Sequence, residues 1–310
     1  MRNKTGTIKV KYEVRELDKI GAVSFVEQHH YSPVMPAITK HYLGFYLDSA
    51  LVGVLTLGWG TRPRDTFKKM FPGFKDEVNE KTEDGKYIYP ISNYYLEIGK
   101  MCMTDDMPRN SESQMMSATI RWLKDNHPKC LFLYTMADGI MGKCGYVYQA
   151  SNFYFGDKYF TDVYLMENGE KLHPRTSKEL CKENALFLKE KNDGRWDKLK
   201  RPEQVFWLTS DFMQKKGIKR ISGYMFRYIY PLNKTAKKYL KPMPKLKEDV
   251  GIGKTTFDWF HQSYPKDVDL IWYDITDRKN KKKIPMPDFN LEVENMKYNK
   301  NKKVALENFF

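Results

Sequence analysis

An apolar run, a helical segment and a second apolar run follow one another in the middle of this sequence. The first run, Tyr94–Met103, predicts a central strand, and the second, Cys130–Met136, predicts another buried strand. The segment between them predicts a helix over about residues 112–126, with Ser111 and Gln114 matching a capping box at its start. Two strands connected through a helix are parallel neighbours joined by a right-handed crossover. The pattern therefore predicts a sheet with at least one parallel pair.

The flanking sequence continues this alternation of strands and helices. We expect a strand at 7–14, a helix at 17–29, strands at 41–50 and 51–57 joined at Asp48 and Ser49, a short helix at about 141–151, strands within 153–166 and a late strand at 223–230. This order predicts an α/β fold with a mixed, twisted sheet and helices on both faces.

Three stretches lie outside this core. A polar insert at about 62–93, rich in Pro and Gly, predicts a long loop with little structure of its own. Loops of this length in compact domains are more often functional than accidental. A second polar insertion covers about 168–205, and residues 243–310 form a C-terminal extension of open role. The expected organisation is a catalytic domain at 1–242, with the two insertions, followed by that extension.

The net charge of +14 is concentrated in the second half of the chain. Residues 1–160 carry 21 Lys and Arg against 18 Asp and Glu, whereas residues 161–310 carry 32 against 21. Within Arg195–Lys241 there are 13 basic and three acidic residues, interleaved with aromatic side chains. Such interleaving is typical of nucleic-acid surfaces, although a solvated Lys-rich surface is the alternative. The expected contacts to phosphate are Lys215, Lys216, Lys219, Arg220 and Arg227.

The sequence argues against several classes of protein. Its four cysteines have no metal-ligand spacing, which favours an intracellular protein with reduced thiols. It has no apolar signal core and no run of 18 apolar residues, so neither secretion nor a membrane partner is expected. It contains no P-loop, no G-x-S-x-G elbow, no H-E-x-x-H and no zinc-deaminase signature.

Two polar groups lie where the predicted elements end. His30 and Tyr31 follow the first predicted helix and precede Pro33, which places an imidazole and a phenol on a rigid loop. Asp138 follows an apolar strand, where α/β sheets place their ligand sites. The structural alternatives are a histidine satisfied within the fold and a carboxylate that caps the next helix.

Two further segments carry candidate ligand contacts. Tyr148, Gln149 and Asn152 lie in a stretch whose side chains can stack on a base or hydrogen-bond to its edge, with core packing as the alternative for the tyrosine. The loop before the central helix offers backbone N–H groups and the Arg109 guanidinium to an anion, with an ordinary capped turn as its alternative.

Taken together, these segments resemble the phage Mom family of DNA-modification proteins. The resemblance covers about residues 10–240 without the two insertions. It rests on six runs: His30–Ser32, Leu96–Met101, Pro108–Ser113, Ala137–Gly139, Gly145–Phe153 and Gly223–Leu232.

The resemblance implies a fold similar to the GNAT acetyltransferases. It also implies conversion of adenine in double-stranded phage DNA to an N6-carbamoylmethyl, or methylcarbamoyl, derivative that blocks restriction, in the cytoplasm of the infected bacterium. The family's functional residues fall on His30, Tyr31, Asp138 and Tyr148, which the resemblance implies as catalytic residues and as ligands of iron(II). A mechanism without metal would use Asp138 or His30 to accept a proton from the N6 amine.

The expected donor site departs from the GNAT pattern. Its residues are Arg109, Asn110, Ser111 and Ser113, and the loop lacks the glycines that let a GNAT backbone approach a pyrophosphate. This counts against an acyl-CoA donor and leaves the donor open. The competing hypotheses are a GNAT-type N-acyltransferase of proteins or small amines and a DNA-binding module without catalysis.

Overall fold

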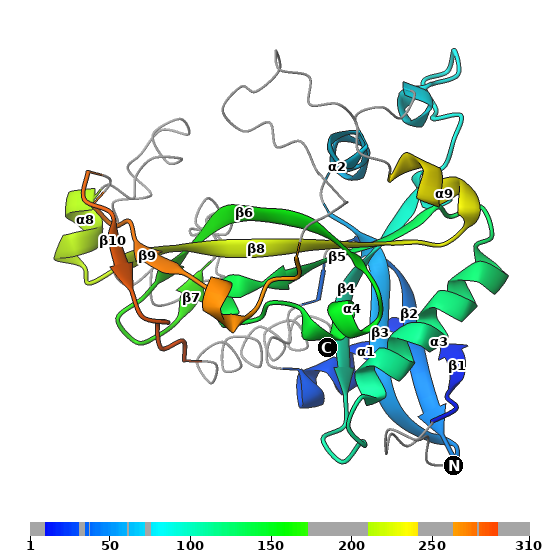
Figure 1. Cartoon of the computed structure of the whole chain (residues 1–310), viewed down its shortest axis with the longest axis horizontal. Coiled ribbons are helices and arrows are strands. Elements are labelled where there is room, and N and C mark those ends of the chain that lie inside the picture. The colour runs from blue at the N-terminus through cyan, green and yellow to red at the C-terminus, as the bar shows by residue number, and fades with distance from the viewer. Residues whose placement is uncertain are drawn as a thin grey trace, which may run out of the picture. The chain divides into compact units, whose positions relative to one another are not determined.

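The structure is a computed structural model that describes residues 10–30, 35–36, 38–60, 62–71, 76–172, 210–240, 263–277 and 279–290. Figure 1 shows its helices and strands, coloured by residue number. The chain divides into two compact units. The first unit comprises Met1–Ala137, Gly145–Lys158 and Phe226–Pro265, and the second comprises Asp138–Cys144, Tyr159–Met225 and Lys266–Phe310. Among the described residues, no helix has the length and the apolar character needed to cross a membrane.

Seven of the described strands form a mixed sheet in the order β1-β2-β3-β4-β5-β8-β6, and the residues of β6 and β8 are divided between the two units. Their bounds are β1 Glu13–Glu16, β2 Ile38–Leu47, β3 Ala50–Trp59, β4 Tyr95–Met103, β5 Phe132–Asp138, β6 Tyr154–Leu165 and β8 Lys219–Pro231. The pairs β1–β2, β2–β3 and β3–β4 are antiparallel. β4 and β5 are parallel and pair Glu97 with Tyr134. The predicted parallel pair and the mixed α/β sheet are confirmed.

The turn between β2 and β3 consists of Asp48 and Ser49, as predicted. Both residues have positive φ angles, 48° and 69°. Two successive residues with positive φ form the type I′ turn, whose twist matches that of the strands it joins. This turn fixes which side chains of β3 face each side of the sheet.

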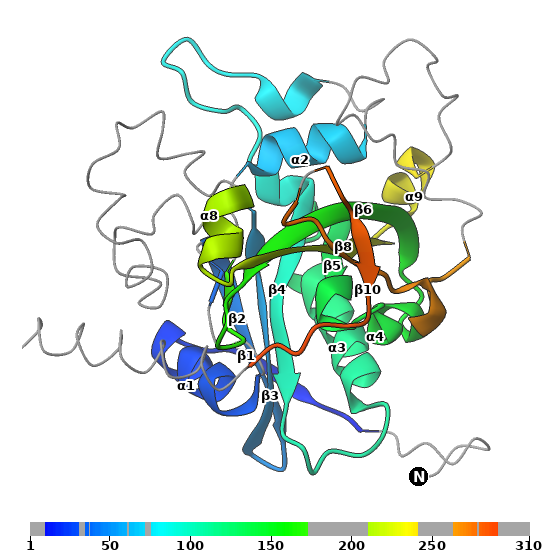
Figure 2. The same ribbon diagram turned by 90° about the vertical axis from the view of Figure 1, so that its left-hand side faces the viewer.

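Helices cover both faces of the first unit's sheet. α1, Lys19–His29, packs against Val54 on one face of the sheet. α3, Ser111–Asn126, lies on the other face, where a Cβ on Gly53 would be 2.9 Å from the Met115 side chain. Neighbouring residues of a strand face opposite sides, so α1 and α3 lie on opposite faces, as Figure 2 shows. The predicted central helix is confirmed with its start one residue earlier.

The insert at 62–93 is more ordered than predicted. It contains α2, Pro63–Met70, and two short 3₁₀ turns, η1 at Asp76–Asn79 and η2 at Ile91–Asn93. Phe67 of α2 is fully buried, stacks on Tyr95 and contacts the tilted ring of Phe71, and Phe71 in turn stacks on Phe132. The prediction of a loop with little structure was therefore wrong, because α2 is an amphipathic helix that is stabilised by strands distant in sequence.

The second unit has its own core, and the strands described in it are the C-terminal part of β6, the N-terminal part of β8 and three short strands. β6 pairs with β7, Lys171–Leu172; β8 pairs with β9, Trp272–Asp274; and β9 pairs with β10, Lys282–Ile284. Ile221, Trp272 and Ile284 pack with Ile140 and other apolar side chains. Part of the predicted C-terminal extension therefore adds strands to β8. The second predicted insertion falls largely outside the described residues, and the domain boundary at 242 stays a prediction.

Candidate active site

Asp138 is the last residue of β5 and caps the turn that follows it. Its Oδ1 accepts hydrogen bonds from the backbone N–H groups of Ile140, at 3.1 Å, and Met141, at 3.4 Å, which begin the 3₁₀ turn η3, Gly139–Met141. The capping alternative is therefore realised. Both bonds end on Oδ1 and the residue is only partly buried, and a role for Asp138 as a proton acceptor stays a prediction.

Tyr148 lies on the short helix α4, Tyr146–Ala150, within a cluster of aromatic rings. Its ring centroid is 5.6 Å from that of Phe153 and 5.3 Å from that of Tyr228. Burial raises the pKa of the Tyr148 phenol above its ordinary value of 10.0, against the opposing effect of a hydrogen bond with Thr135. Tyr148 is therefore a neutral phenol, held in place by packing and one hydroxyl partner.

Gly145 allows α4 to begin where it does. Its φ is +88°, and a Cβ there would lie 2.6 Å from the Tyr228 ring and 3.1 Å from the Ala137 side chain. The left-handed conformation and the close approach both require glycine. This one position therefore sets how the Tyr148 helix lies against β5 and β8 within the first unit.

The Gln149 side chain is used inside the first unit. Its Nε2 donates to the Tyr228 hydroxyl at 3.0 Å and to the Pro265 carbonyl at 2.9 Å. Asn152 is exposed and has a φ of 60°. The amide N–H groups of Gln149 thus stabilise the protein. Contact with a base edge stays a prediction for both residues, and it fits the exposed Asn152 better than Gln149.

His30 ends the first helix. Its backbone N–H donates to the Val26 carbonyl at 2.9 Å and its side chain is partly buried, whereas Tyr31 lies outside the described residues. A Cβ on Gly99 would lie 2.6 Å from Pro36, so Pro36, six residues after His30, packs directly on β4. His30 and Tyr148 belong to the first unit and Asp138 to the second. A shared site for these residues stays a prediction.

Glu97 on β4 was missed by the sequence reasoning. Burial raises the pKa of its carboxyl above the ordinary 4.5, although the Gly60 N–H and the Tyr95 hydroxyl hydrogen-bond to it. Glu97 lies just ahead of a β-bulge, because the register of β4 against β3 shifts between Ile98 and Met101. The available signal was a single carboxylate within an otherwise apolar strand.

The loop before α3 is an ordinary turn closed by its own side chains. The Ser111 hydroxyl donates to the Pro108 carbonyl at 2.5 Å, and the Ser113 hydroxyl donates to Asn110 at 3.0 Å. Asn110 is the N-cap residue, with a φ of 70°, and Gln114 Oε1 accepts from the Val10 N–H at 2.7 Å. The predicted capping box is therefore wrong, because Gln114 reaches a distant segment. Arg109 and Asn110 are exposed, and their contact with a donor stays a prediction.

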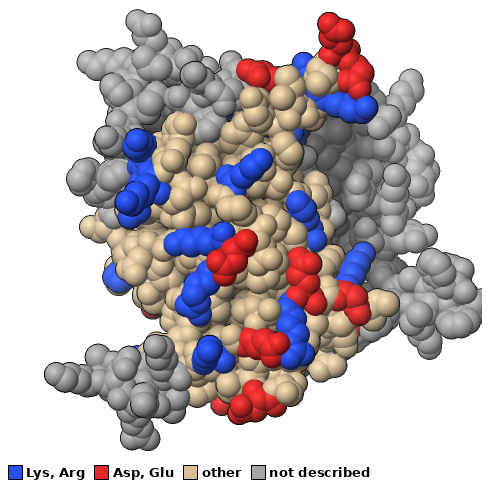
Figure 3. Space-filling view, turned by 90° about the vertical axis from the view of Figure 1, so that its right-hand side faces the viewer, with Lys and Arg blue, Asp and Glu red and all other residues tan. Residues whose placement is uncertain are grey.

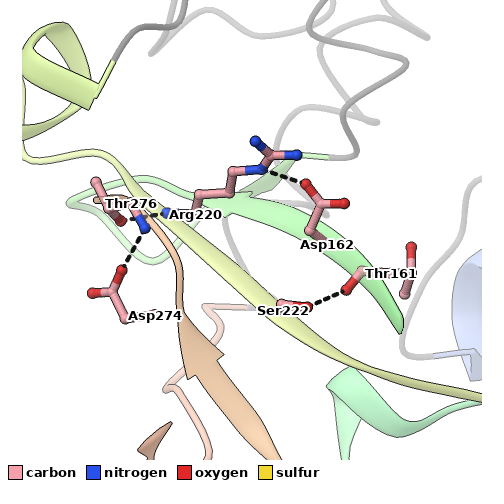
Figure 4. A network of polar contacts seen from close by, with 6 residues as sticks. All are labelled: Thr161, Asp162, Arg220, Ser222, Asp274 and Thr276. Carbon is pink, nitrogen blue, oxygen red and sulfur yellow. Dashed lines mark hydrogen bonds and ion pairs between the residues drawn. The ribbon is translucent and has the colours of Figure 1, made fainter. Parts of the chain in front are cut away.

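The predicted phosphate contacts divide by environment. Lys215 and Lys219 are exposed and Lys216 is partly so. Arg220 pairs with Asp162 through an Nε–Oδ2 contact of 2.5 Å, as Figure 4 shows. Arg227 is only 8% exposed, so it is placed to stabilise the interior rather than to contact a phosphate.

Basic charge also occurs on the first unit. Helix α9, Lys234–Tyr239, exposes Lys234, Lys237 and Lys238. On the described surface in Figure 3, basic side chains are interspersed with acidic ones. This face therefore has a mixed electrostatic character.

The iron prediction depends on phenol oxygens. Among the described residues, there is no group of three or more His, Cys, Asp or Glu side chains that could hold a metal ion. Iron binding through His30, Tyr31, Asp138 and Tyr148 stays a prediction, and no step proposed below uses a metal.

Comparison with known proteins gives two matches. The model of the Mom protein family matches residues 11–247. The chain is also similar to Methylcarbamoylase mom of Escherichia phage Mu, with 29% identity over 231 residues that cover 72% of this chain and 80% of that protein. The family match over 11–247 includes β1 to β6, β8 and the helices α1 to α4.

Proposed function

This chain belongs to the Mom protein family, and we propose on that premise that it is a phage DNA-modification enzyme that methylcarbamoylates adenine. The observation that carries the proposal is the family match over 11–247. That span contains the end of β5 with Asp138 and the whole of α4 with Tyr148. The proposed reaction attaches the group to the exocyclic N6 amine in double-stranded DNA, in the cytoplasm of the infected host.

The proposed chemistry requires one proton acceptor. Forming an N–C bond at N6 replaces one N–H bond, so a proton must leave the amine, whose lone pair is conjugated into the ring. Asp138 Oδ2 is the proposed acceptor, because Oδ1 already holds the turn Gly139–Met141. The capping bonds would keep the carboxylate in one orientation while Oδ2 faces the substrate.

Tyr148 is proposed to act as a neutral hydrogen-bond donor. Its raised pKa keeps the proton on the phenol at neutral pH, and the rings of Phe153 and Tyr228 fix its direction. In a duplex the N6 amine is held in a Watson–Crick pair and is presented only at its edge in the major groove, so the proposed enzyme would extrude the adenine from the stack to bring the amine to its side chains. His30 is the proposed third catalytic residue.

A GNAT-like arrangement is proposed for the sheet. The parallel pairing of β4 and β5 runs only from Tyr95 to Glu97, although β4 continues to Met103. Among the described residues, the pairing of β4 with β5 does not extend beyond Glu97, and the end of β4 precedes the loop of Arg109 and Asn110, where the donor of the transferred group is proposed to bind. Ligands of α/β sheets bind outside the carboxyl ends of the strands.

Mass spectrometry of nucleosides tests the proposal. The full chain is co-expressed with a plasmid, and adenine nucleosides from that plasmid are compared with those from Asp138→Asn and Tyr148→Phe samples. We expect a modified adenine nucleoside with the unaltered chain and its loss in both variants. Unmodified adenine in every sample would overturn the proposal, and an acylated protein or amine in its place would favour an N-acyltransferase. Metal analysis of the purified chain beside His30→Ala tests the iron prediction separately.

A further inference from the structure

The sheet of the second unit has one apolar face and one face that carries exposed aromatic rings. Ile221, Trp272 and Ile284 pack into the unit's core, and a Cβ on Gly223 would lie 2.9 Å from Ile140. The registers pair Ser222 and Lys283 with Tyr273, so these three residues point away from that core. The outward face is therefore defined by strand register.

Three aromatic rings meet on the outward face. Phe160 on β6 is 46% exposed, and its centroid lies 4.4 Å from that of Tyr224 on β8, with an interplanar angle of 32°. The Phe160 centroid is also 6.0 Å from that of Tyr273 on β9. We call Phe160, Tyr224 and Tyr273, together with Lys281 and Lys283, the aromatic platform.

Lysines supply positive charge at this face. Lys281 Nζ lies 3.7 Å from the Tyr273 centroid and 4.5 Å from the Phe160 centroid. Lys281 immediately precedes β10. Lys283, two residues after Lys281, lies on the same side and is exposed. Asp162, on the same side of β6 as Phe160, is already neutralised by Arg220 (Figure 4). The charge left on the aromatic platform is therefore positive.

A sheet face with exposed rings and lysines matches the chemistry of a single nucleic-acid strand. Unpaired bases stack on aromatic side chains without sequence preference, and the lysines neutralise the adjoining phosphates. Bases within a duplex are already stacked and cannot use such rings. The chemistry of this face therefore suits a DNA strand whose bases are unpaired. Such an unpaired stretch is present whenever a base is extruded from a duplex.

We propose that the aromatic platform binds an unpaired stretch of the DNA substrate, with bases stacking on Phe160 and Tyr273 and phosphates contacting Lys281 and Lys283. This inference rests on the proposed function for the identity of the substrate. Strands β9 and β10 lie beyond residue 247, where the family match ends. The proposal assigns these two strands a role in holding the DNA strand.

Binding of a fluorescently labelled single-stranded oligodeoxynucleotide and of its duplex tests this proposal with the full chain. Phe160→Leu keeps an apolar side chain without a π face, and it should weaken single-strand binding about tenfold and duplex binding much less. Phe160→Tyr keeps the ring and should bind as the unaltered chain does. Equal single-strand affinity of Phe160→Leu and the unaltered chain, or an equal loss for single strand and duplex, would overturn the proposal.

Lys282 provides the matched control for the charge. Its register partner is Asp274, so it points to the opposite side of β10 from Lys281. Lys281→Ala should reduce the slope of log affinity against log salt for single strands by about 0.7, whereas Lys282→Ala should leave it unchanged. Identical slopes for the two variants would contradict the lysine contact. Oligonucleotide binding requires no turnover, so absence of modified adenine would overturn the proposed function alone.

Discussion

The Tyr95 hydroxyl donates a hydrogen bond to Glu97 Oε1 at 3.1 Å, two residues along the same strand. The same hydroxyl also lies 2.8 Å from the Pro63 carbonyl at the start of α2. Strand β4 thereby carries a partly buried carboxyl on the face that α2 covers. That carboxyl makes the stability of the protein dependent on pH.

Glu97→Gln should flatten this pH dependence. Burial raises the pKa of Glu97 in the folded state above 4.5, so the folded protein holds the proton more tightly than the unfolded chain does. The contribution of this carboxyl to stability is greatest below pH 4.5 and is lost as the pH rises through the folded-state pKa. Urea unfolding at pH 5 and pH 8 should therefore show a smaller difference for Glu97→Gln than for the unaltered chain. An undiminished difference would mean that Glu97 does not cause it.

Substitutions at Asp138 should separate its capping role from its chemistry. Asn retains an oxygen that accepts from the Ile140 N–H, whereas Ala removes it. Asp138→Asn should therefore keep the stability, and Asp138→Ala should lose about 1 kcal/mol, the usual cost of an N-cap. Both should abolish modification of co-expressed DNA. Modified adenine from the Asp138→Asn sample would show that the carboxylate is only a cap.

Tyr148→Phe should leave the fold intact and stop modification. The ring contacts with Phe153 and Tyr228 are retained, and the loss of the Thr135 hydrogen bond costs about 1 kcal/mol. Tyr228→Phe is the matched control, because it removes a hydroxyl of the same cluster that accepts from Gln149. Equal loss of modification in the two variants would indicate that the cluster, rather than the Tyr148 hydroxyl, matters.

Gly145→Ala should destabilise the protein more than Gly85→Ala. Both glycines have positive φ, +88° and +80°, and the left-handed conformation alone costs a non-glycine residue about 1–2 kcal/mol. Nothing lies within 4 Å of a Cβ at Gly85, whereas a Cβ at Gly145 meets Tyr228 at 2.6 Å. Overpacking should add about 1–3 kcal/mol at Gly145. Urea unfolding measures the difference, and equal free energies of unfolding would refute the close contact.

Substituting Lys215, Lys216 and Lys219 together by Ala should reduce the salt dependence of duplex binding. The slope of log affinity against log salt should fall by about 0.9 for each lysine that contacts a phosphate. The matched comparison replaces Lys234, Lys237 and Lys238 on α9, which are exposed on the first unit. If only the α9 variant changes the slope, the duplex contacts that helix and the prediction for the second-unit lysines is wrong.

The β-α-β core could be predicted from sequence because its signals are local. The apolar runs of β4 and β5 and the periodicity of α3 are readable within a few residues, and the structure places all three close to the expected bounds. α2 could not be found in this way, because the burial of Phe67 depends on Tyr95 and Phe132, 28 and 65 residues further along.

The candidate site also has features that local sequence predicts and features that depend on distant residues. The sequence by itself determined the order of the core strands and helices, the position of Asp138 at a strand end and the family resemblance, since these depend on local periodicity and contiguous runs. Only the tertiary structure decided that Gln149 donates to Pro265, that Arg220 pairs with Asp162 and that burial raises the pKa of Glu97. A polar side chain takes its role from the partner and the solvent around it, and those are supplied by residues distant in the chain.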